Sequence, residues 1–453
     1  MKLRTLAVAL LFSAIPAFSQ TDPGPRGGAA GAGGPLSSVA ADSPSTILSF
    51  FNDAQTRFTK VDAVADGLGP RFNSRSCASC HAQPTTGGSS PATNPEVADA
   101  TANGATNTVP SFITSTGPVR EARFIFLADS SGNPTSTPSG MVEELYTIVG
   151  RTDHGTCTSA DISQPNFAAA ASHNNIIYRI PTPVFGGGLI EGIDESDLLA
   201  NLASRTGNPY GTSGTFNHNG HDGTITRFGW KAQNKSLLIF AGEAYNVEMG
   251  VSNEMFTQER PLPEEDHAPG TGLSANCRLN LMPEDHTNFG ATAVGTPSDV
   301  VQFAMFMRLL APAKQASNTG QSLISVINGE ALFGDVGCTS CHNTHFTTGP
   351  SDITSSLDHA EVRLWSDLAI HHMGTGLADN VVQGDAGADQ FRTAPLWGVG
   401  QRLFFLHDGR KTNLLDAITA HSSTGSEANT VIANFNALSV SDKQDILNFL
   451  RSL

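Results

Sequence analysis

Two short stretches of the sequence share one pattern of cysteine and histidine. Residues 75–84 read RSCASCHAQP and residues 337–346 read GCTSCHNTHF, so each stretch holds two cysteines, two spacer residues and a histidine. Two thiols at this spacing can add to both vinyl groups of one porphyrin, and the adjacent imidazole can then reach the iron. The pattern therefore predicts two covalently bound haem c groups. The predicted attachment thiols are Cys77, Cys80, Cys338 and Cys341, and the predicted proximal ligands are His81 and His342.

Two other uses of paired cysteines fit this sequence less well. A redox-active CxxC pair needs no histidine after it, and a structural zinc site needs a second ligand pair at short range, which neither stretch has. The two remaining cysteines, Cys157 and Cys277, predict either one disulfide in an oxidising compartment or two distant free thiols.

The sixth coordination position of each iron decides what the haem does. A strong protein ligand gives an electron-transfer haem, whereas an open position can bind peroxide or dioxygen. Of the 14 histidines, 12 lie outside the two motifs, and eight methionines also compete, so spacing alone does not choose the ligand.

The N-terminus predicts export. Lys2 and Arg4 precede a short apolar run, and residues 17–19 supply a small-x-small cleavage signal, so residues 1–19 resemble a signal peptide, with a retained membrane anchor as the alternative. No later stretch approaches ~18 uninterrupted apolar residues. We therefore expect a soluble periplasmic protein without membrane insertion. The net charge of −16 argues against nucleic acid as a partner and is compatible with a basic electron-carrier protein.

Helical patterns surround both motifs. Residues 47–58, 301–311 and 322–337 place apolar side chains at helical spacing, and the third of these segments runs into the second motif. The chain ends in an amphipathic helix, residues 438–453, where Ser439 forms a capping pair with the acidic residue three positions later. A helix that ends at CxxCH and a terminal amphipathic helix are the two ends of a class I cytochrome c domain.

Other segments predict loops and short strands. Residues 20–45 are rich in Gly, Ala, Pro and Ser, which predicts an extended arm, and residues 82–118 have a similar loop-like composition. The runs RFIFLA (123–128) and LYTIVG (145–150) predict short strands of a small sheet.

Several stretches resemble the bacterial di-haem cytochrome c peroxidases. RFGWKAQNKSLLIFAGEAYNVEMG (227–250) is similar to the segment of that family that ends in Asn-x-x-Glu-Met, and APLWGVGQRLFFLHDGRKTNLLDAITAH (394–421) is similar to its segment around His-Asp-Gly. GLGPRFNSRSCASCHAQP (67–84) and SDLAIHHMGTGLAD (366–379) resemble one branch directly, the di-haem oxidoreductases or peroxidases. The di-haem rubber oxygenases are more distant relatives. The resemblance covers most of the mature chain and is strongest from residue 225 onward.

The resemblance implies roles for two residues. Trp230 corresponds to the tryptophan that lies between the two haems and bridges electron transfer. Glu248 corresponds to the distal glutamate, which can take a proton from one peroxide oxygen and return it to the other. Without the family, a lone tryptophan is usually a core residue and an isolated glutamate a solvated one.

The resemblance also implies a ligand for the second haem. His421 stands fourteen residues after His407, where the classical peroxidases place a methionine ligand. A bis-histidine iron, bound by His342 and His421, would have a lower potential than its methionine-ligated counterpart. The rival sixth ligands are Met373, His371 and His372.

Two departures from the family are visible. Trp230 stands 149 residues after His81, so residues 85–225 form a large insertion beside the first haem. The loop histidine that caps this haem in resting classical peroxidases has four candidate counterparts: His154, His173, His218 and His221. Arg402 and Phe404 occupy the slots of the Thr-x-Pro that serves the family's calcium site, so we do not expect calcium there.

These inferences predict a mainly α protein with two cytochrome c-like helical domains. Residues 46–300 form the first, with a loop-rich insertion that contains short strands, and residues 301–453 form the second. We expect a peroxidase that reduces hydrogen peroxide at the first haem, with electrons that a small redox protein such as cytochrome c delivers to the second. A di-haem oxygenase or protein-modifying oxidase, and a plain electron-transfer cytochrome, are the alternatives.

Overall fold

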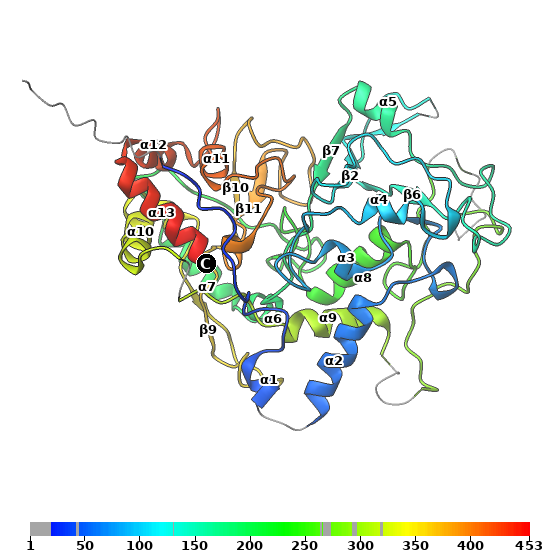
Figure 1. Cartoon of the computed structure of the whole chain (residues 1–453), viewed down its shortest axis with the longest axis horizontal. Coiled ribbons are helices and arrows are strands. Elements are labelled where there is room, and N and C mark those ends of the chain that lie inside the picture. The colour runs from blue at the N-terminus through cyan, green and yellow to red at the C-terminus, as the bar shows by residue number, and fades with distance from the viewer. Residues whose placement is uncertain are drawn as a thin grey trace, which may run out of the picture.

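Helices dominate the regular structure, and the strands form only small sheets (Figure 1). The computed structural model describes residues 20–41, 45–129, 131–262, 265, 273–291, 297–317 and 320–453. The predicted signal peptide lies outside these residues. The prediction of a mostly helical chain with short strands is confirmed at this level. Among the described residues, no helix is both long enough and apolar enough to span a membrane.

Three helices frame the first CxxCH motif. They are α2 (Ser45–Thr59), α8 (Leu237–Met249) and α9 (Asp299–Leu309), and α9 packs against both of the others. Aromatic rings fill the contacts: the ring of Phe306 lies 4.7 Å from that of Phe58, and the ring of Phe303 lies 5.1 Å from that of Tyr245. The helices predicted at 47–58 and 301–311 are therefore confirmed.

Helices α10 (Leu323–Asp335) and α13 (Val440–Ser452) frame the second motif and pack closely on each other. Gly329 lets them approach, because a Cβ atom there would lie 2.0 Å from the carbonyl oxygen of Asp445. Ser439 caps α13 as predicted, since its hydroxyl accepts a hydrogen bond from the Asp442 amide at 3.2 Å. Figure 1 shows these helices at one side of the molecule with α11 (Leu414–Thr419) and α12 (Asn429–Ala437).

The buried apolar side chains divide between these helix groups. The larger core surrounds α2, α8 and α9, and a second core, with Phe333, Trp365, Phe435 and Phe449 at its centre, lies between α10, α12 and α13.

Small sheets occupy the predicted insertion. Strand β2 (Glu121–Phe124) is the central strand of a three-stranded antiparallel sheet, between β5 (Val142–Glu143) and β7 (Ile176–Arg179). Its register places Glu121 directly opposite Arg179.

The remaining strands form two-stranded antiparallel pairs. These are β1 (Arg71–Phe72) with β6 (Tyr146–Thr147), β3 (Phe126–Ala128) with β4 (Pro134–Pro138), β8 (Phe346–Thr347) with β9 (Glu361–Val362), and β10 (Ile370–His372) with β11 (Gln390–Arg392).

Short helices complete the chain. They are α1 (Ser37–Ala41), η1 (Val64–Asp66), α3 (Cys77–Cys80), α4 (Glu96–Asp99), η2 (Ala102–Gly104), α5 (Phe167–Ser172), α6 (Gly187–Glu191), α7 (Glu195–Ala203), η3 (Cys338–Ser340) and η4 (Val399–Gln401). Cys157 and Cys277 form a disulfide, which confirms the first of the two readings of these cysteines and ties the insertion to the segment before α9.

The N-terminal arm packs along the molecule. Asp22 forms a buried ion pair with Arg451 of α13 at 2.6 Å, and the amide of Leu36 donates to the carbonyl of Leu309 at 2.8 Å. The composition of the arm predicted no core, yet Leu36 and Val39 are buried in the larger one. Leu36 is held at the end of α9 by its hydrogen bond to Leu309, and Val39 lies in α1, a short helix inside the arm that contacts α2.

Candidate haem sites and the tryptophan between them

The first CxxCH motif folds as a single helical turn. The amide of His81 donates to the carbonyl of Cys77 at 3.1 Å, which brings both thiols and the imidazole to one side of α3. The Nδ1–H group of His81 donates to the Gly88 carbonyl at 3.1 Å, so Nε2 remains free to bind a metal. Burial lowers the pKa of His81, which favours the neutral, ligating form.

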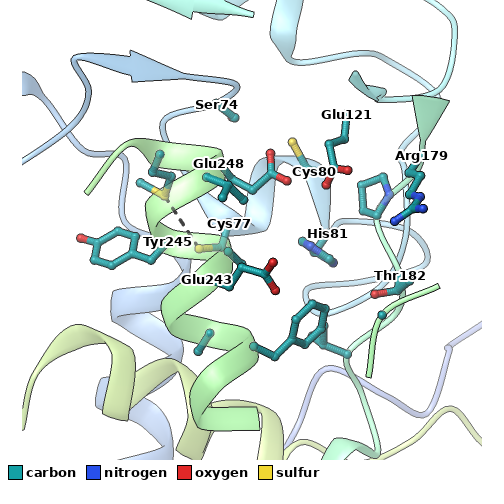
Figure 2. Close-up of a pocket in the computed structure, with 18 of the residues that line it drawn as sticks. Ser74, Cys77, Cys80, His81, Glu121, Arg179, Thr182, Glu243, Tyr245 and Glu248 are labelled. Atoms are coloured by element: carbon teal, nitrogen blue, oxygen red, sulfur yellow. Dashed lines mark hydrogen bonds between the residues drawn. The ribbon is translucent and has the colours of Figure 1, made fainter. Parts of the chain in front are cut away.

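A cavity of about 1160 Å³, its opening to solvent included, surrounds this motif. Helices α2, α8 and α9 form one part of its wall, and the insertion forms another. Figure 2 shows Glu248 and Glu121 with their carboxyl groups turned toward the same part of the cavity, beside Cys80.

Glu248 is fixed at the end of α8 by the chain that leads to the motif. The amides of Asn73 and Ser74 donate to the carbonyl of Glu248 at 2.7 and 3.3 Å, and the Asn73 side chain donates to its carboxylate at 2.7 Å. Gly250 then ends α8 with φ of 75°, where a Cβ atom would lie 2.1 Å from the carbonyl oxygen of Arg71. Glu248 thus lies in the first cavity, where the sequence analysis expected it.

The insertion adds charged residues that the sequence analysis did not identify. Glu121 forms an ion pair with Arg123, and both line the first cavity together with Arg179. The sequence held a local signal for this pair. The predicted strand began at Arg123, and residues two positions apart in a strand share a face, so a strand extended back to Glu121 would place both side chains on one face. Burial and the nearby Glu121 raise the pKa of Glu248 well above its usual range.

The second CxxCH motif has the same construction. Gly337, with φ of 101°, starts the turn and leaves room for the ring of Tyr210, which would lie 2.6 Å from a Cβ atom. The amide of His342 donates to the Cys338 carbonyl at 2.9 Å, and its Nδ1–H donates to the Trp365 carbonyl at 2.9 Å. Burial lowers the pKa of His342 to about 4, so this imidazole is also neutral.

His421 lines the cavity of the second motif, which measures about 1330 Å³ with its opening. Its Nδ1–H group donates to the Ala417 carbonyl of α11 at 2.8 Å, which leaves Nε2 free, as in His81 and His342. Burial lowers the pKa of His421. The structure thus places His421 in the same cavity as His342 and in a tautomer that can bind iron.

The rival ligands differ in what they can offer. Both ring nitrogens of His371 lie 2.9 Å from carboxylate oxygens, one of Asp367 and one of Glu427, so the ring must donate at both positions and has no lone pair for a metal. His372 is exposed and does not line the cavity. Met373 lines the cavity and stays a rival of His421.

Trp230 lies between the two sites. Its buried side chain lines both the first and the second cavity, and Nε1–H donates to the Ile180 carbonyl at 2.9 Å. The guanidinium of Arg402 covers its ring at 5.7 Å from the ring centre. Trp230 therefore borders both cavities.

The residues present fit two haem groups. The four cysteines of the motifs are free thiols, and each motif opens into its own cavity. Arg392 is buried and Arg402 half-buried at the wall of the second cavity, no ion pair joins either to a described carboxylate, and Nε of Arg402 is buried without a hydrogen-bond partner. Cations of this kind suit the carboxylates that a porphyrin carries.

The structure places none of the four candidate capping histidines in the first cavity. His173, His218 and His221 are exposed, and the Nδ1 atom of His154 bonds with the Cys157 carbonyl at 2.8 Å beside the disulfide. Among the described residues that line this cavity, His81 is the only histidine.

One family model matches the chain: di-haem oxidoreductase, putative peroxidase, over residues 159–453, which is more than half of the sequence. No curated protein matches.

Three solved structures share short portions of fold with the chain. Hydrazine synthase from Kuenenia stuttgartiensis, pressurised with 20 bar xenon, is 18% identical over 36% of this chain and 56% of its own, with a TM-score of 0.23. A MauG-like protein associated with microbial copper homeostasis is 18% identical over 34% and 52%, with a TM-score of 0.22. The di-haem peroxidase BthA from Burkholderia thailandensis E264 is 15% identical over 50% and 65%, with a TM-score of 0.27. The chain thus spans between half and two thirds of each of these structures, and the low TM-scores carry no functional argument.

Proposed function

The chain belongs to the di-haem oxidoreductase family of peroxidase-like enzymes, and from this membership we propose that it reduces hydrogen peroxide at its first haem site with electrons relayed from its second. One observation carries the proposal. Trp230 lines both cavities, whereas Glu248 lines only the first and His421 only the second.

The chain offers a complete set of residues for holding the haems. Cys77 and Cys80 would attach the first haem, Cys338 and Cys341 would attach the second, and His81, His342 and His421 would bind the irons. Arg392 and Arg402 would receive haem carboxylates. When bound, the haems supply iron that exchanges single electrons and, at the first site, a position where peroxide binds.

The backbone prepares the three imidazoles for this role. Each donates Nδ1–H to a carbonyl oxygen, of Gly88, Trp365 and Ala417 respectively, which fixes the ring and makes Nε2 the stronger donor. His342 and His421 would both bind the second iron and so close that site to substrate. His81 is the only histidine among the described residues that line the first cavity, which would leave room for substrate beside Glu248.

Glu248 moves the proton that peroxide cleavage requires. A carboxyl group in contact with the substrate can donate to the departing oxygen, which then leaves as water instead of hydroxide. The insertion covers this side of the cavity with β2 and β7 and so limits the access of bulk water.

Trp230 relays electrons between the sites. Its indole is fixed by the hydrogen bond to Ile180 and covered by Arg402, so it stays in one position between the two cavities. A small redox protein such as cytochrome c supplies the electrons at the second site.

The proposal also includes export to the periplasm, where haem c is attached, and two domains. Residues 46–300 with their insertion carry the first haem and residues 301–453 the second, and each motif has a helical core of its own, although α9 across this boundary packs in the core of the first.

Peroxide turnover by the haem-loaded protein tests the proposal. Protein from a haem-maturing host, given a reduced small cytochrome c, should oxidise it when hydrogen peroxide is added. Glu248→Gln keeps the shape of the side chain and removes its acid–base function, so turnover should fall ~10²-fold or more with haem content unchanged. Glu259→Gln is the matched control, because Glu259 is also buried but lies outside the cavity.

Other outcomes would identify the alternatives. Oxygen-dependent formation of an organic product without peroxide turnover would make the protein an oxygenase or a protein-modifying oxidase. Two low-spin haems that exchange electrons and react with neither oxidant would make it a plain electron carrier.

A further inference from the structure

A second carboxyl group lies beside Glu248 in the first cavity. Glu121 is the first residue of β2, and the antiparallel register with β7 places it directly opposite Arg179. Glu121 also forms an ion pair with Arg123, whose guanidinium is held in place by a 2.8 Å hydrogen bond to the Gly140 carbonyl. Arg123 therefore stabilises negative charge on Glu121 directly, and the charge of Arg179, whose own ion pair is with Asp379 at 2.8 Å, acts in the same direction.

Within the part of the chain that the structure describes, Glu248 has no cation as a hydrogen-bond partner. Asn73 donates to one of its carboxyl oxygens at 2.7 Å, Glu121 is its other side-chain partner, and the described residues give it no ion pair. Two carboxyl groups can form a hydrogen bond only if one of them carries a proton. Because the arginines hold the charge on Glu121, the proton belongs to Glu248.

The electrostatic surroundings agree with this distribution. Burial and Glu121 raise the pKa of Glu248 well above its usual range. Burial alone would raise the pKa of Glu121 too, but the charge of Arg123 and the hydrogen bond with Glu248 lower it. The two groups thus titrate apart, as expected of carboxyls that share one proton.

We propose that Glu121 and Glu248 act as one proton-sharing pair, in which Glu121 accepts a proton from bound peroxide while Glu248 donates one to the departing oxygen. This inference rests on the proposed function. It assigns the role of the base to Glu121 and leaves Glu248 the role of the acid. A protonated Glu248 can donate but cannot accept, so a base must come from elsewhere. Glu121 can supply it, because it is the carboxylate that is hydrogen-bonded to Glu248.

The step balances without a further reactant. Reduction of one hydrogen peroxide to two waters takes two electrons and two protons. The pair gives one proton to the leaving oxygen and takes one from the other oxygen as the O–O bond breaks, so it keeps one proton in total. The two protons consumed overall come from solvent, and the two electrons come from the one-electron donor protein.

Other charged or titratable groups line the same cavity. One of these is Glu96, and burial raises its pKa to about 8. Its carboxyl group accepts a hydrogen bond from the side-chain amide of Asn94 at 3.0 Å and another from the backbone of Arg120, the residue before Glu121. The remaining groups of this kind are Cys77, Cys80, His81, Arg123, Arg179, Glu243 and Tyr245.

The pH dependence of turnover tests the pair. In the wild type, kcat/KM should be constant between the two carboxyl titrations, fall at low pH when Glu121 is protonated, and fall at high pH when Glu248 ionises. Glu121→Gln removes the base, so kcat/KM at neutral pH should fall ~10²-fold. The variant should regain activity as pH rises, because Glu248 ionises more easily without its charged neighbour and can then act as the base.

Further variants separate catalysis from folding. Glu121→Asp keeps the charge beside the arginines but withdraws the carboxylate from Glu248, so it should fold normally and show a smaller loss of the same kind. The double variant Glu121→Gln with Glu248→Gln should be no slower than Glu248→Gln alone, because the two residues act as a unit. A profile of Glu121→Gln and Glu121→Asp that matches the wild type would overturn the pair.

Infrared spectra of the haem-loaded protein provide a test that needs no turnover. At neutral pH, Glu248→Gln should remove one band of a protonated carboxyl group, and Glu121→Gln should shift the loss of that band to lower pH. Glu259→Gln identifies the band of an unrelated buried carboxyl. Absence of peroxide turnover with these spectra intact would reject the proposed function and leave the proton-sharing pair in place, whereas a spectrum unchanged by Glu248→Gln would reject the pair itself.

Discussion

Four glutamates and one histidine line the first cavity, whereas four histidines and one glutamate line the second. Both start from the same five-residue motif with the same hydrogen bonds from amide to cysteine carbonyl and from Nδ1–H to a loop carbonyl. The motif therefore fixes how a haem is attached and bound from one side. The residues that the fold brings to the opposite side determine what the site can do.

The origin of those residues also differs. The second cavity takes His421 from the turn after α11 and apolar side chains from α10, α12 and α13, all within the last 131 residues of the chain (323–453). The first takes Glu248 from α8 and its arginines and second carboxylate from the insertion. The insertion also reaches the second site, where Thr212 lines the cavity and Tyr210 packs against Gly337, but its described residues supply no carboxyl or guanidinium group to that cavity.

Removal of either attachment pair should have the largest effect and separates the sites completely. Cys77→Ser with Cys80→Ser should leave one haem, with the spectrum of the second site, and no peroxide turnover. Cys338→Ser with Cys341→Ser should leave the other haem and abolish turnover with the protein donor. Mass spectrometry of the denatured proteins counts the haems.

The disulfide supplies the control for this experiment. Cys157→Ser with Cys277→Ser should keep both haems and lower the free energy of unfolding by about 2–5 kcal/mol, because the bridge closes a long loop. A wild-type mass with fewer than two added haems would contradict covalent attachment at both motifs.

Replacement of the tryptophan between the cavities should have a smaller effect. Trp230→Phe preserves an aromatic ring in the same space but loses the indole and its bond to Ile180, so both haem spectra should persist while electron transfer from the second site to the first slows. Stopped-flow spectroscopy after rapid reduction of the second site measures that step. Trp397→Phe is the control, since Trp397 is equally buried but lines neither haem cavity. An unchanged rate in Trp230→Phe would remove the relay.

The features predicted from sequence are those encoded locally. The CxxCH turns need only five adjacent residues, and α2, α9, α10 and α13 follow from apolar side chains that recur with the helical period. The cap at Ser439 likewise depends on residues three positions apart. Each of these signals is complete within a short window of sequence.

The features that were missed depend on pairing between distant segments. Glu121 and Arg179 come together only through the register of β2 with β7, and no local pattern specifies that register. Asp22 and Arg451 lie at opposite ends of the chain. The composition of residues 20–45 predicted only an extended arm, so it could not predict this ion pair. The sequence could not exclude His371 as an iron ligand, because the fold alone brings Asp367 and Glu427 to its two ring nitrogens.

The identity of the ligand opposite His342 is the finest distinction between the cavities, and its replacement should disturb turnover least. If His421 binds the second iron, the wild type should show a bis-imidazole low-spin signal in electron paramagnetic resonance and lack the near-infrared band of histidine–methionine haem. His421→Ala should convert that signal to high spin and leave the first site unchanged. His421→Met should introduce the near-infrared band and raise the potential of this haem, because sulfur stabilises ferrous iron relative to imidazole.

His372→Ala is the matched control, because His372 is exposed and pairs with Asp389 outside the cavity. It should leave both signals as they are. A low-spin signal that survives in His421→Ala would assign the position to Met373, the rival that lines the same cavity with an uncharged donor atom. The second site would then match the classical methionine-ligated haem in its ligand while differing from it in the segment that supplies the ligand.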